Sequence, residues 1–249
     1  MTQQMIEALP ITHWRTPNDH GARYAVREDT NDGALIAGII GQDEYGLTGE
    51  KFSGWVIDVG AHIGIVAVAI ALDNPAVRVV CIEAIAENAA MVRRNVELNG
   101  LSDRVFVEHA GASEPGATEV DITYDYKWAG KPGHLEPVVP QNYLEQSRFI
   151  GNIFRYPEDQ MEATTEQVPA LSLDQIIEKY EMTDVALVKI DCEACEYQFL
   201  ATKAVKHVER ILGEFHKTAA PIEKMLKKTH TVTIRLDQGG VGIFDAVRR

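Results

Sequence analysis

The stretch V-I-D-V-G-A-H-I-G, residues 56–64, decides the fold. An apolar run ends here at a glycine, and the apolar small-residue stretch I-G-I-V-A-V-A-I-A-L (63–72) follows. The first part is typical of a buried strand and the second of a buried helix, and the glycine allows a tight turn between them. In an open parallel sheet, ligands bind where the strands end. The stretch therefore predicts a binding site at the first turn of an α/β sheet.

The same alternation of apolar runs and amphipathic stretches continues along the chain. Strands are expected at 55–60, 78–84, 104–110, 185–191, 210–216, 231–236 and 242–247. Helices are expected at 63–74, 86–100, 172–180, 193–205 and 221–229. Strands that alternate with helices form parallel sheets, whereas the D-Q-G-G link between the last two strands indicates an antiparallel hairpin. We expect a Rossmann-like, three-layer, doubly wound α/β sheet, mostly parallel, with an antiparallel C-terminal hairpin strand.

The chain divides into an N-terminal extension at 1–50, with a strand near 24–27 and a helix near 35–40, and a main domain at 51–249. A proline-containing insertion at 113–170 interrupts the alternation. Its aromatic side chains either cover a substrate or pack on the sheet: Tyr124, Tyr126, Trp128, Phe149, Phe154 and Tyr156. Long insertions in compact domains are usually functional or mobile.

Composition excludes several classes of protein. Hydrophobic residues make up 45% of the 249 residues and charged residues 24%, as in soluble globular proteins. A formal net charge of -13 disfavours nucleic-acid partners, because it repels phosphate. No apolar stretch approaches the roughly 20 residues of a membrane helix, and no signal-peptide pattern opens the chain. Three cysteines form no disulfide framework, so we expect a cytoplasmic protein with reduced thiols and no membrane partner. A homo-oligomer is compatible with the sequence.

The glycine turn and an acidic residue after the next strand favour one class of cofactor. Gly60 and Gly64 form G-x-x-x-G, without the third glycine that a dinucleotide site uses to hold a pyrophosphate. Glu83 ends the following strand, 25 residues after Asp58, and a carboxylate there can accept both hydroxyls of a ribose. A nucleoside without a pyrophosphate fits this pattern, and S-adenosylmethionine is such a cofactor.

Five segments together resemble the FkbM-type methyltransferases, a class I, seven-stranded, S-adenosylmethionine-dependent family. They are V-I-D-V-G-A-H-I-G, V-V-C-I-E-A-I-A-E-N-A-A-M-V-R-R-N-V-E-L-N-G, S-L-D-Q-I-I, V-K-I-D-C-E-A-C-E-Y-Q-F-L and G-E-F-H, within 54–216. The resemblance implies methyl transfer, most often to an oxygen of a small molecule or sugar. Residues expected to bind the cofactor are Asp58, Gly60, Ala61, His62, Gly64, Glu83, Ala84, Ala110 and Gly111.

The chain departs from the family pattern in two places. His62 replaces the asparagine of D-V-G-A-N-x-G and adds a group that titrates near neutral pH. In the later motif, Cys192 and Cys195 stand at the valine and alanine positions, and Ala194 stands at the glycine. We expect the cysteines to pack as small hydrophobic residues. Zinc or redox chemistry is the alternative, although a structural zinc needs four ligands.

Acidic residues and a histidine follow two strands whose ends are expected to adjoin. Asp191 and Glu193 follow one strand, and Glu214 and His216 end the next. A histidine or carboxylate can remove the proton of a hydroxyl that accepts a methyl group. We expect His216 to be the base, with Glu193 or Glu214 orienting it beside Asp191. We expect Glu196, next to them, to start a helix. The same residues suit a divalent cation, but nothing in the sequence requires a metal.

Two further residues have open roles. His109, at the end of the third strand, faces the substrate or caps the strand, while the loop at Ala110 and Gly111 flanks the adenine. Tyr45, in the N-terminal extension, closes over the cleft.

The expected function is S-adenosylmethionine-dependent O-methylation of a small-molecule or sugar hydroxyl. The alternatives are N-methylation of an amine or peptide, an NAD-dependent oxidoreductase, and a binding module without catalysis.

Overall fold

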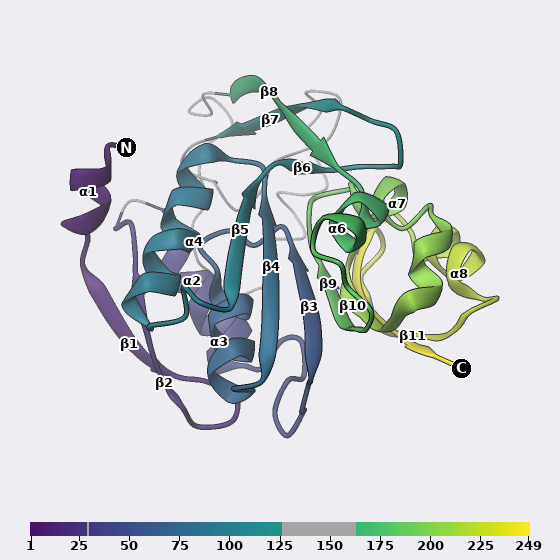
Figure 1. Ribbon diagram of the computed structural model, residues 1–249, viewed down its shortest axis with the longest axis horizontal. Helices are drawn as coiled ribbons and strands as arrows, with labels where there is room; N and C mark the ends of the chain where they lie inside the picture. The colour runs from purple at the N-terminus through teal and green to yellow at the C-terminus, as the bar shows by residue number, and fades with distance from the viewer. Residues whose placement is uncertain (29, 126–162) are drawn as a thin grey trace.

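The computed structural model describes residues 1–28, 30–125 and 163–249. Its centre is a seven-stranded sheet with the order β11-β12-β10-β9-β3-β4-β5 (Figure 1). The strands are β3 (Gly54–Val59), β4 (Val77–Glu83), β5 (Val105–His109), β9 (Val185–Ile190), β10 (Val208–His216), β11 (His230–Asp237) and β12 (Val241–Arg248). Neighbours from β5 to β10 pair in parallel, whereas β12 is antiparallel to both β10 and β11. The expected sheet with its antiparallel C-terminal hairpin is confirmed.

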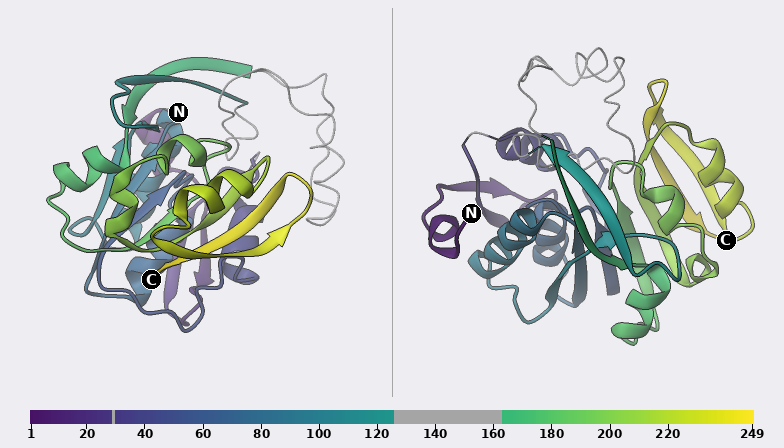
Figure 2. Two further views of the ribbon diagram at one scale, coloured as in Figure 1. Left: turned by 90° about the vertical axis from the view of Figure 1, so that its right-hand side faces the viewer. Right: turned by 90° about the horizontal axis from the view of Figure 1, so that it is seen from above.

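Helices cover both faces of this sheet, because side chains along each strand point alternately to opposite sides. Val56 and Val79 join the apolar cluster of α3 (Ile65–Asp73) and α4 (Ala86–Leu98). Ile57 and Val80 join the cluster on the other face. The helices of that second face are α6 (Leu173–Lys179), α7 (Glu196–Phe199) and α8 (Ala220–Leu226). The three layers can be followed in Figure 2. Within the described ranges, no helix is long and apolar enough to cross a membrane.

The predicted continuous helix at 193–205 is wrong. The structure has the short helix α7 and, separately, the 3-10 helix η4 (Lys203–His207). Glu193 and Ala194 have φ angles of 53° and 80°, which lie outside the helical region. Thr202 is extended, and its hydroxyl accepts from the Ala204 amide to begin η4. The backbone after β9 therefore turns before it becomes helical.

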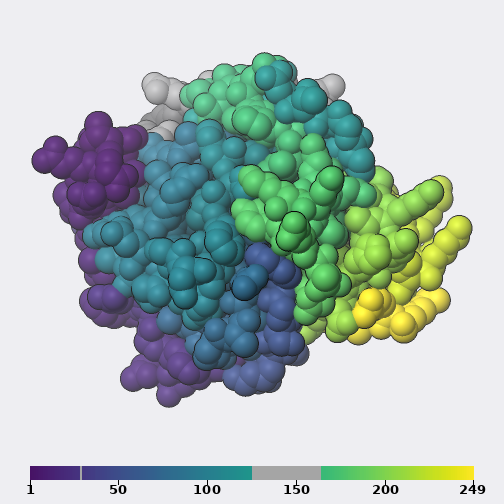
Figure 3. Space-filling view, in the orientation of Figure 1, coloured from purple at the N-terminus to yellow at the C-terminus, as the bar shows by residue number. Residues whose placement is uncertain are grey.

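Residues 1–50 pack into the same hydrophobic core as the sheet. They form α1 (Gln3–Glu7), the antiparallel pair β1 (Ile11–Arg15) and β2 (Gly21–Ala25), α2 (Asp32–Ile36) and the π-helix η1 (Ala37–Gly41). Helix α3 is apolar around its whole circumference, and such a helix needs cover on every side. Tyr24 of β2 is fully buried in that cluster and donates its hydroxyl to the Ile65 carbonyl at 3.1 Å. Figure 3 shows this segment along one flank of the molecule.

A buried ion pair fastens the N-terminal segment to the first glycine turn. Arg27 donates from Nη2 and Nε to the two oxygens of Asp32, at 2.7 and 2.9 Å. Asp32 Oδ1 also lies 3.2 Å from His62 Nε2. The side chains of Arg27 and Asp32 are almost completely shielded from solvent. The segment thus contacts the predicted cofactor site through charge as well as through apolar packing.

The described part of the 113–170 insertion forms a small second sheet with the order β6-β8-β7. Its strands are β6 (Gly111–Ala112), β7 (Glu119–Asp125) and β8 (Ala163–Leu171). Because β6 follows β5 directly, this sheet lies beyond the carboxyl end of β5, across the top of Figure 1. Tyr124 is partly buried against the cluster of Ile85, Ile122 and Val168. The other predicted cover aromatics lie outside the described residues: Tyr126, Trp128, Phe149, Phe154 and Tyr156.

We predict that Asp32→Asn lowers the free energy of unfolding by ~3 kcal/mol or more, because buried Arg27 loses the charge of its short-range partner and keeps a longer ion pair, at 3.7 Å, with Glu87. Urea unfolding followed by circular dichroism measures the change. Asp19→Asn is the control, since the Arg15–Asp19 pair is exposed and such pairs contribute less than ~1 kcal/mol. Equal losses in the two variants would contradict a stabilising role for the buried pair.

Candidate functional site

The turn after β3 lies directly against the end of β9. Gly60 has a φ of 71°, and a Cβ atom there would lie 1.8 Å from the Asp191 carbonyl oxygen. Only glycine permits this conformation and this approach together. The predicted cofactor turn and the predicted acidic cluster therefore adjoin.

Four backbone amides of the turn are already hydrogen-bonded. Gly60 and Ala61 donate to the Ile82 carbonyl at 3.0 and 3.2 Å, and Gly64 donates to the Ala61 carbonyl at 2.7 Å. The His62 amide donates to Glu83 Oε2 at 2.7 Å. A ligand over this turn would therefore contact its backbone by close approach, without taking up these amides.

A buried ion pair supports the turn. Lys189 Nζ lies 3.3 Å from Asp58 Oδ1 and donates to the Gly60 carbonyl at 3.1 Å. Burial opposes the lysine charge, yet the carboxylates of Asp58 and Asp191 outweigh it and raise the pKa of Lys189. Asp58 is fully buried and faces Lys189, so its contact with the turn is indirect. The sequence analysis missed Lys189, although it precedes the acidic motif by two residues.

Glu83 ends β4 with its carboxylate turned toward the backbone. Besides the His62 amide, it accepts from the Ile85 amide at 2.9 Å. Burial raises the pKa of Glu83 to about 7. Asn88 Nδ2 donates a third, longer hydrogen bond to Glu83, at 3.4 Å. A carboxylate has about four lone-pair sites, so these three hydrogen bonds still leave capacity for a ligand. Glu83 thus links the glycine turn to the loop after β4.

The loop after β5 is fixed by contacts within the protein. His109 Nε2 lies 3.0 Å from the Ala84 carbonyl, and the Ala110 amide donates to the Glu83 carbonyl at 3.1 Å. A Cβ atom on Gly111 would come within 2.3 Å of Val120 Cγ2. Packing against β7 therefore accounts for the glycine, and His109 fastens the loop to the end of β4.

His62 occupies a backbone position that explains why the family pattern has asparagine there. Its φ is 54°, in the left-handed region where Asn, Asp and His are enriched among non-glycine residues. The ring is buried, and burial lowers the pKa of His62 even though Asp32 partly offsets the effect. The imidazole therefore belongs to the interface with the N-terminal segment.

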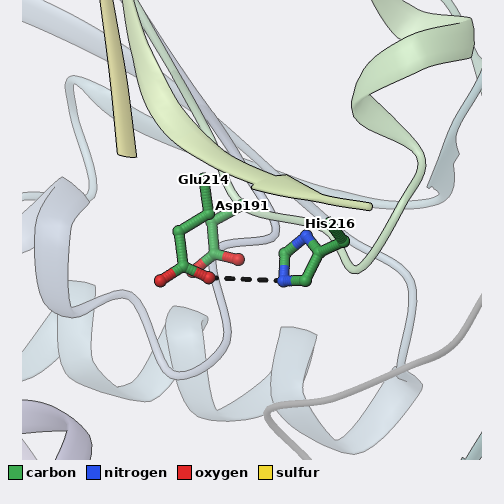
Figure 4. Close-up of side chains that lie close together, drawn as sticks. All are labelled: Asp191, Glu214 and His216. Carbon is green, nitrogen blue, oxygen red and sulfur yellow. Dashed lines mark ion pairs between the residues drawn. The ribbon is translucent and has the colours of Figure 1, made fainter. Parts of the chain in front are cut away.

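The predicted acidic residues and the histidine converge at the ends of β9 and β10. His216 Nε2 lies 3.3 Å from Glu193 Oε2 and 3.3 Å from Glu214 Oε2. Asp191, Glu214 and His216 each offer one nitrogen or oxygen atom that could bind a metal, and these three atoms lie within 4.8 Å of one another. Figure 4 shows the three side chains directed toward a common point. These four residues, Asp191, Glu193, Glu214 and His216, are the acidic cluster.

Glu196 contacts both the backbone and the ring of His216, a role that the sequence pattern did not indicate. Its fully buried carboxylate accepts from the His216 backbone amide at 2.8 Å and lies 3.5 Å from Nδ1. Burial disfavours a charged imidazole, but Glu193, Glu196 and Glu214 outweigh burial and raise the pKa of His216 well above its ordinary value. A raised pKa favours the protonated ring, and a protonated ring takes up no further proton, which weighs against His216 as the base.

The N-terminal segment supplies two side chains to the acidic cluster. The Tyr45 hydroxyl donates to Asp191 Oδ2 at 2.9 Å, and Arg235 holds the segment through the Tyr45 carbonyl at 2.8 Å. Burial, together with the charges of Glu214 and Asp191, raises the pKa of Glu44 to about 7. Tyr45 thus contacts the acidic cluster, whereas its predicted closure over the cleft stays a prediction. Glu44 is an additional acid that the pattern did not indicate.

Cys192 and Cys195 form a disulfide, so the expectation of reduced packing thiols is wrong for this pair. The bond spans Glu193 and Ala194, the two residues with positive φ. Ala194 stands at the family's glycine position, where such a conformation costs least. The disulfide therefore closes the loop that presents Glu193 to His216. Cys81 is free and buried.

We predict that acid destabilises the protein partly through His62. A buried imidazole with a lowered pKa binds its proton less readily when folded, so its contribution is present above pH ~6.5 and is lost as the pH falls. His62→Asn keeps a residue suited to the left-handed backbone and removes the titration. Urea unfolding at pH 7 and pH 5 should show a smaller decrease in the variant. An equal decrease in the two proteins would refute this role of His62.

Comparison with known proteins shows the family of the chain. The family model described as the methyltransferase FkbM domain matches residues 58–236. No curated protein matches the sequence.

Several solved structures match the chain at low identity. The FkbM methyltransferase of Methylobacillus flagellatus KT is 16% identical with a TM-score of 0.47, covering 80% of this chain and 45% of its own. This chain thus spans less than half of that protein. The putative tRNA (m1A22) methyltransferase Sp1610 of Streptococcus pneumoniae is 10% identical with a TM-score of 0.47, over 83% of this chain and 69% of its own. The O-methyltransferase of Bacillus cereus is 16% identical with a TM-score of 0.40, over 79% and 74%. Because the family model spans most of the sheet, the chain belongs to the FkbM methyltransferase domain family and is an S-adenosylmethionine-dependent methyltransferase.

Proposed function

We propose that the protein transfers the methyl group to a hydroxyl oxygen of a small molecule or sugar. The observation that carries the proposal is the acidic cluster at the ends of β9 and β10, which adjoins the Gly60 turn. Methyl transfer needs an acceptor held in line with the sulfonium methyl group and a group that takes the acceptor's proton. The contact between the turn and the cluster supports the proposal, because it brings carboxylates next to the predicted cofactor turn.

The proposed cofactor site follows the strand ends from β3 to β5. Glu83 accepts the ribose hydroxyls with its remaining lone pairs, and the Gly60–Gly64 turn, with Ala61 and His62, contacts the methionine part. The adenine lies beside Ala84, Ala110 and Gly111. Asp58 acts through Lys189, which it holds beneath the turn. This placement of the cofactor is supported by the hydrogen bonds that join Glu83 to the turn after β3 and to the loop after β4.

The transfer is a single displacement. The acceptor oxygen bonds to the methyl carbon while the carbon–sulfur bond breaks, and the electron pair stays on sulfur to give S-adenosylhomocysteine. The hydroxyl proton passes to the acidic cluster. His216 is the base expected from the sequence, but its raised pKa favours a carboxylate in this role. We therefore place Glu193 first as proton acceptor, with His216 positioning it from 3.3 Å.

N-methylation is the second candidate, and the surplus of carboxylates favours it. A negatively charged pocket attracts a protonated amine, which must then lose a proton before it can accept a methyl group. An amine acceptor would depend less on Glu193, because its nitrogen is nucleophilic once it is neutral. The two candidates therefore differ in what removing Glu193 does.

The test is a screen of hydroxyl and amine acceptors with methyl-labelled cofactor, followed by kinetics of Glu193→Gln. We predict that a hydroxyl acceptor is methylated and that kcat falls by ~100-fold or more in the variant, as for a lost acid–base group. Glu209→Gln, an exposed residue at the opposite end of β10, is the charge-matched control and should retain kcat. Methylation of amines alone, or an unchanged kcat in Glu193→Gln, would refute the proposal.

A further inference from the structure

We propose that Asp191, Glu214 and His216 bind one divalent cation. The site lies where two paired strands end. Gly213 of β10 pairs with Ile190 of β9, and a Cβ atom on Gly213 would lie 1.8 Å from the Ile190 carbonyl oxygen. Glycine therefore allows the two strand ends to come together.

The register of the strands places all three side chains on one side. Glu214 and His216 are two residues apart in β10, and such residues point to the same face of a sheet. Asp191 follows Ile190 directly, so it emerges beside them. The three-residue set thus follows from strand pairing.

The distances suit a single ion. Protein ligands lie about 2.0–2.6 Å from Mg²⁺ or Ca²⁺, so two ligand atoms of one ion are at most roughly 4–5 Å apart. The atoms of Asp191, Glu214 and His216 lie within 4.8 Å of one another. Asp191 and Glu214 are half-buried, which leaves one side of the ion open to water or to an acceptor oxygen.

The burial of the His216 ring without hydrogen-bond partners in the described part of the chain is a second observation, independent of the distances between the ligand atoms. The side chain is 7% exposed, and among the described residues neither ring nitrogen has a partner with hydrogen-bond geometry. Its nearest carboxylate oxygens lie at 3.3, 3.3 and 3.5 Å, whereas charge-assisted hydrogen bonds measure about 2.7–2.9 Å. Buried imidazoles are normally hydrogen-bonded or bound to a metal. Nε2 points toward the carboxylates of the site (Figure 4).

The surrounding charges favour a cation. Glu193 and Glu196 contact His216, and Glu44 of the N-terminal segment adds a further acid whose pKa responds to Asp191 and Glu214. Lys189 also faces the site, but it is paired with Asp58. A divalent cation bound among these carboxylates would offset part of their negative charge.

The ligand set indicates which ions fit. Carboxylates suit Mg²⁺, Ca²⁺ and Mn²⁺, whereas imidazole suits transition metals, so Mn²⁺ satisfies both kinds of ligand. An ion beside the acceptor would lower the pKa of a bound hydroxyl. That role rests on the proposed O-methylation, whereas the binding site itself does not.

Binding is tested with the full chain, treated with a chelator and kept non-reducing, by titration with Mn²⁺ and detection of free ion by electron paramagnetic resonance. We expect one bound ion per chain. Loss of a residue that only hydrogen-bonds a metal ligand typically weakens metal binding ~10–100-fold, so loss of a ligand itself in Glu214→Gln should weaken it at least ~10-fold. Asp191→Asn should have a similar effect. Thermal unfolding of each apo variant checks folding, and Mn²⁺ should raise the Tm of the wild type more than that of either variant.

Three controls separate ligation from the general charge of the site. Glu209→Gln should bind as the wild type does, and Glu193→Gln, which keeps all three ligands, should lose less affinity than Glu214→Gln. Unchanged binding in Cys192→Ser/Cys195→Ser supports the proposed ligands, and loss of binding there would overturn the three-residue ligand set. Absence of stoichiometric Mn²⁺ binding, or full binding in Glu214→Gln, would also overturn the site. Hydroxyl methylation at full rate without bound metal would overturn the role of the ion in the reaction, whereas Mn²⁺ binding without hydroxyl methylation would refute only the O-methylation.

Discussion

The close approach of Gly60 to the Asp191 carbonyl is the constraint on which the rest of the site depends. It joins the turn after β3 to the end of β9, two adjacent strands that are far apart in sequence. Lys189 stabilises this contact, because its ammonium group binds both Asp58 and the Gly60 carbonyl. A larger residue at position 60 would separate the cofactor turn from the acidic cluster. Methyl transfer requires that cofactor and acceptor meet at a fixed distance, and in the proposed function this contact fixes the distance between their two sites.

The N-terminal segment is part of the site as well as of the core. The Arg27–Asp32 pair contacts His62 at the cofactor turn, and Tyr45 binds Asp191 at the acidic cluster. Helix α3 gives the reason for this arrangement, because its apolar outer face needs cover that the sheet cannot supply. The N-terminal segment that covers α3 also reaches the ends of β3 and β9. Stability and site geometry are therefore coupled through the same residues.

The sheet and the convergence of Asp191, Glu214 and His216 could be predicted from the sequence. Strand periodicity is local, and the ends of adjacent parallel strands necessarily adjoin. The disulfide and the break in the helix at 193–205 could not, because apolar spacing does not show that Glu193 and Ala194 have positive φ. The protonation of His216 also depends on Glu196 and other carboxylates gathered by the fold. The uniformly apolar α3 was a signal for the N-terminal cover that sequence analysis did not use.

A crystal structure of the full chain with S-adenosylhomocysteine tests the central claim most directly. The claim is that the strand ends joined by Gly60 and Asp191 hold cofactor and acceptor side by side. It predicts ribose hydroxyls on Glu83, the homocysteine part over the Gly60 turn, and the sulfur facing the acidic cluster. A sulfur that faces away from Asp191 and His216, or a ribose bound away from Glu83, would contradict it.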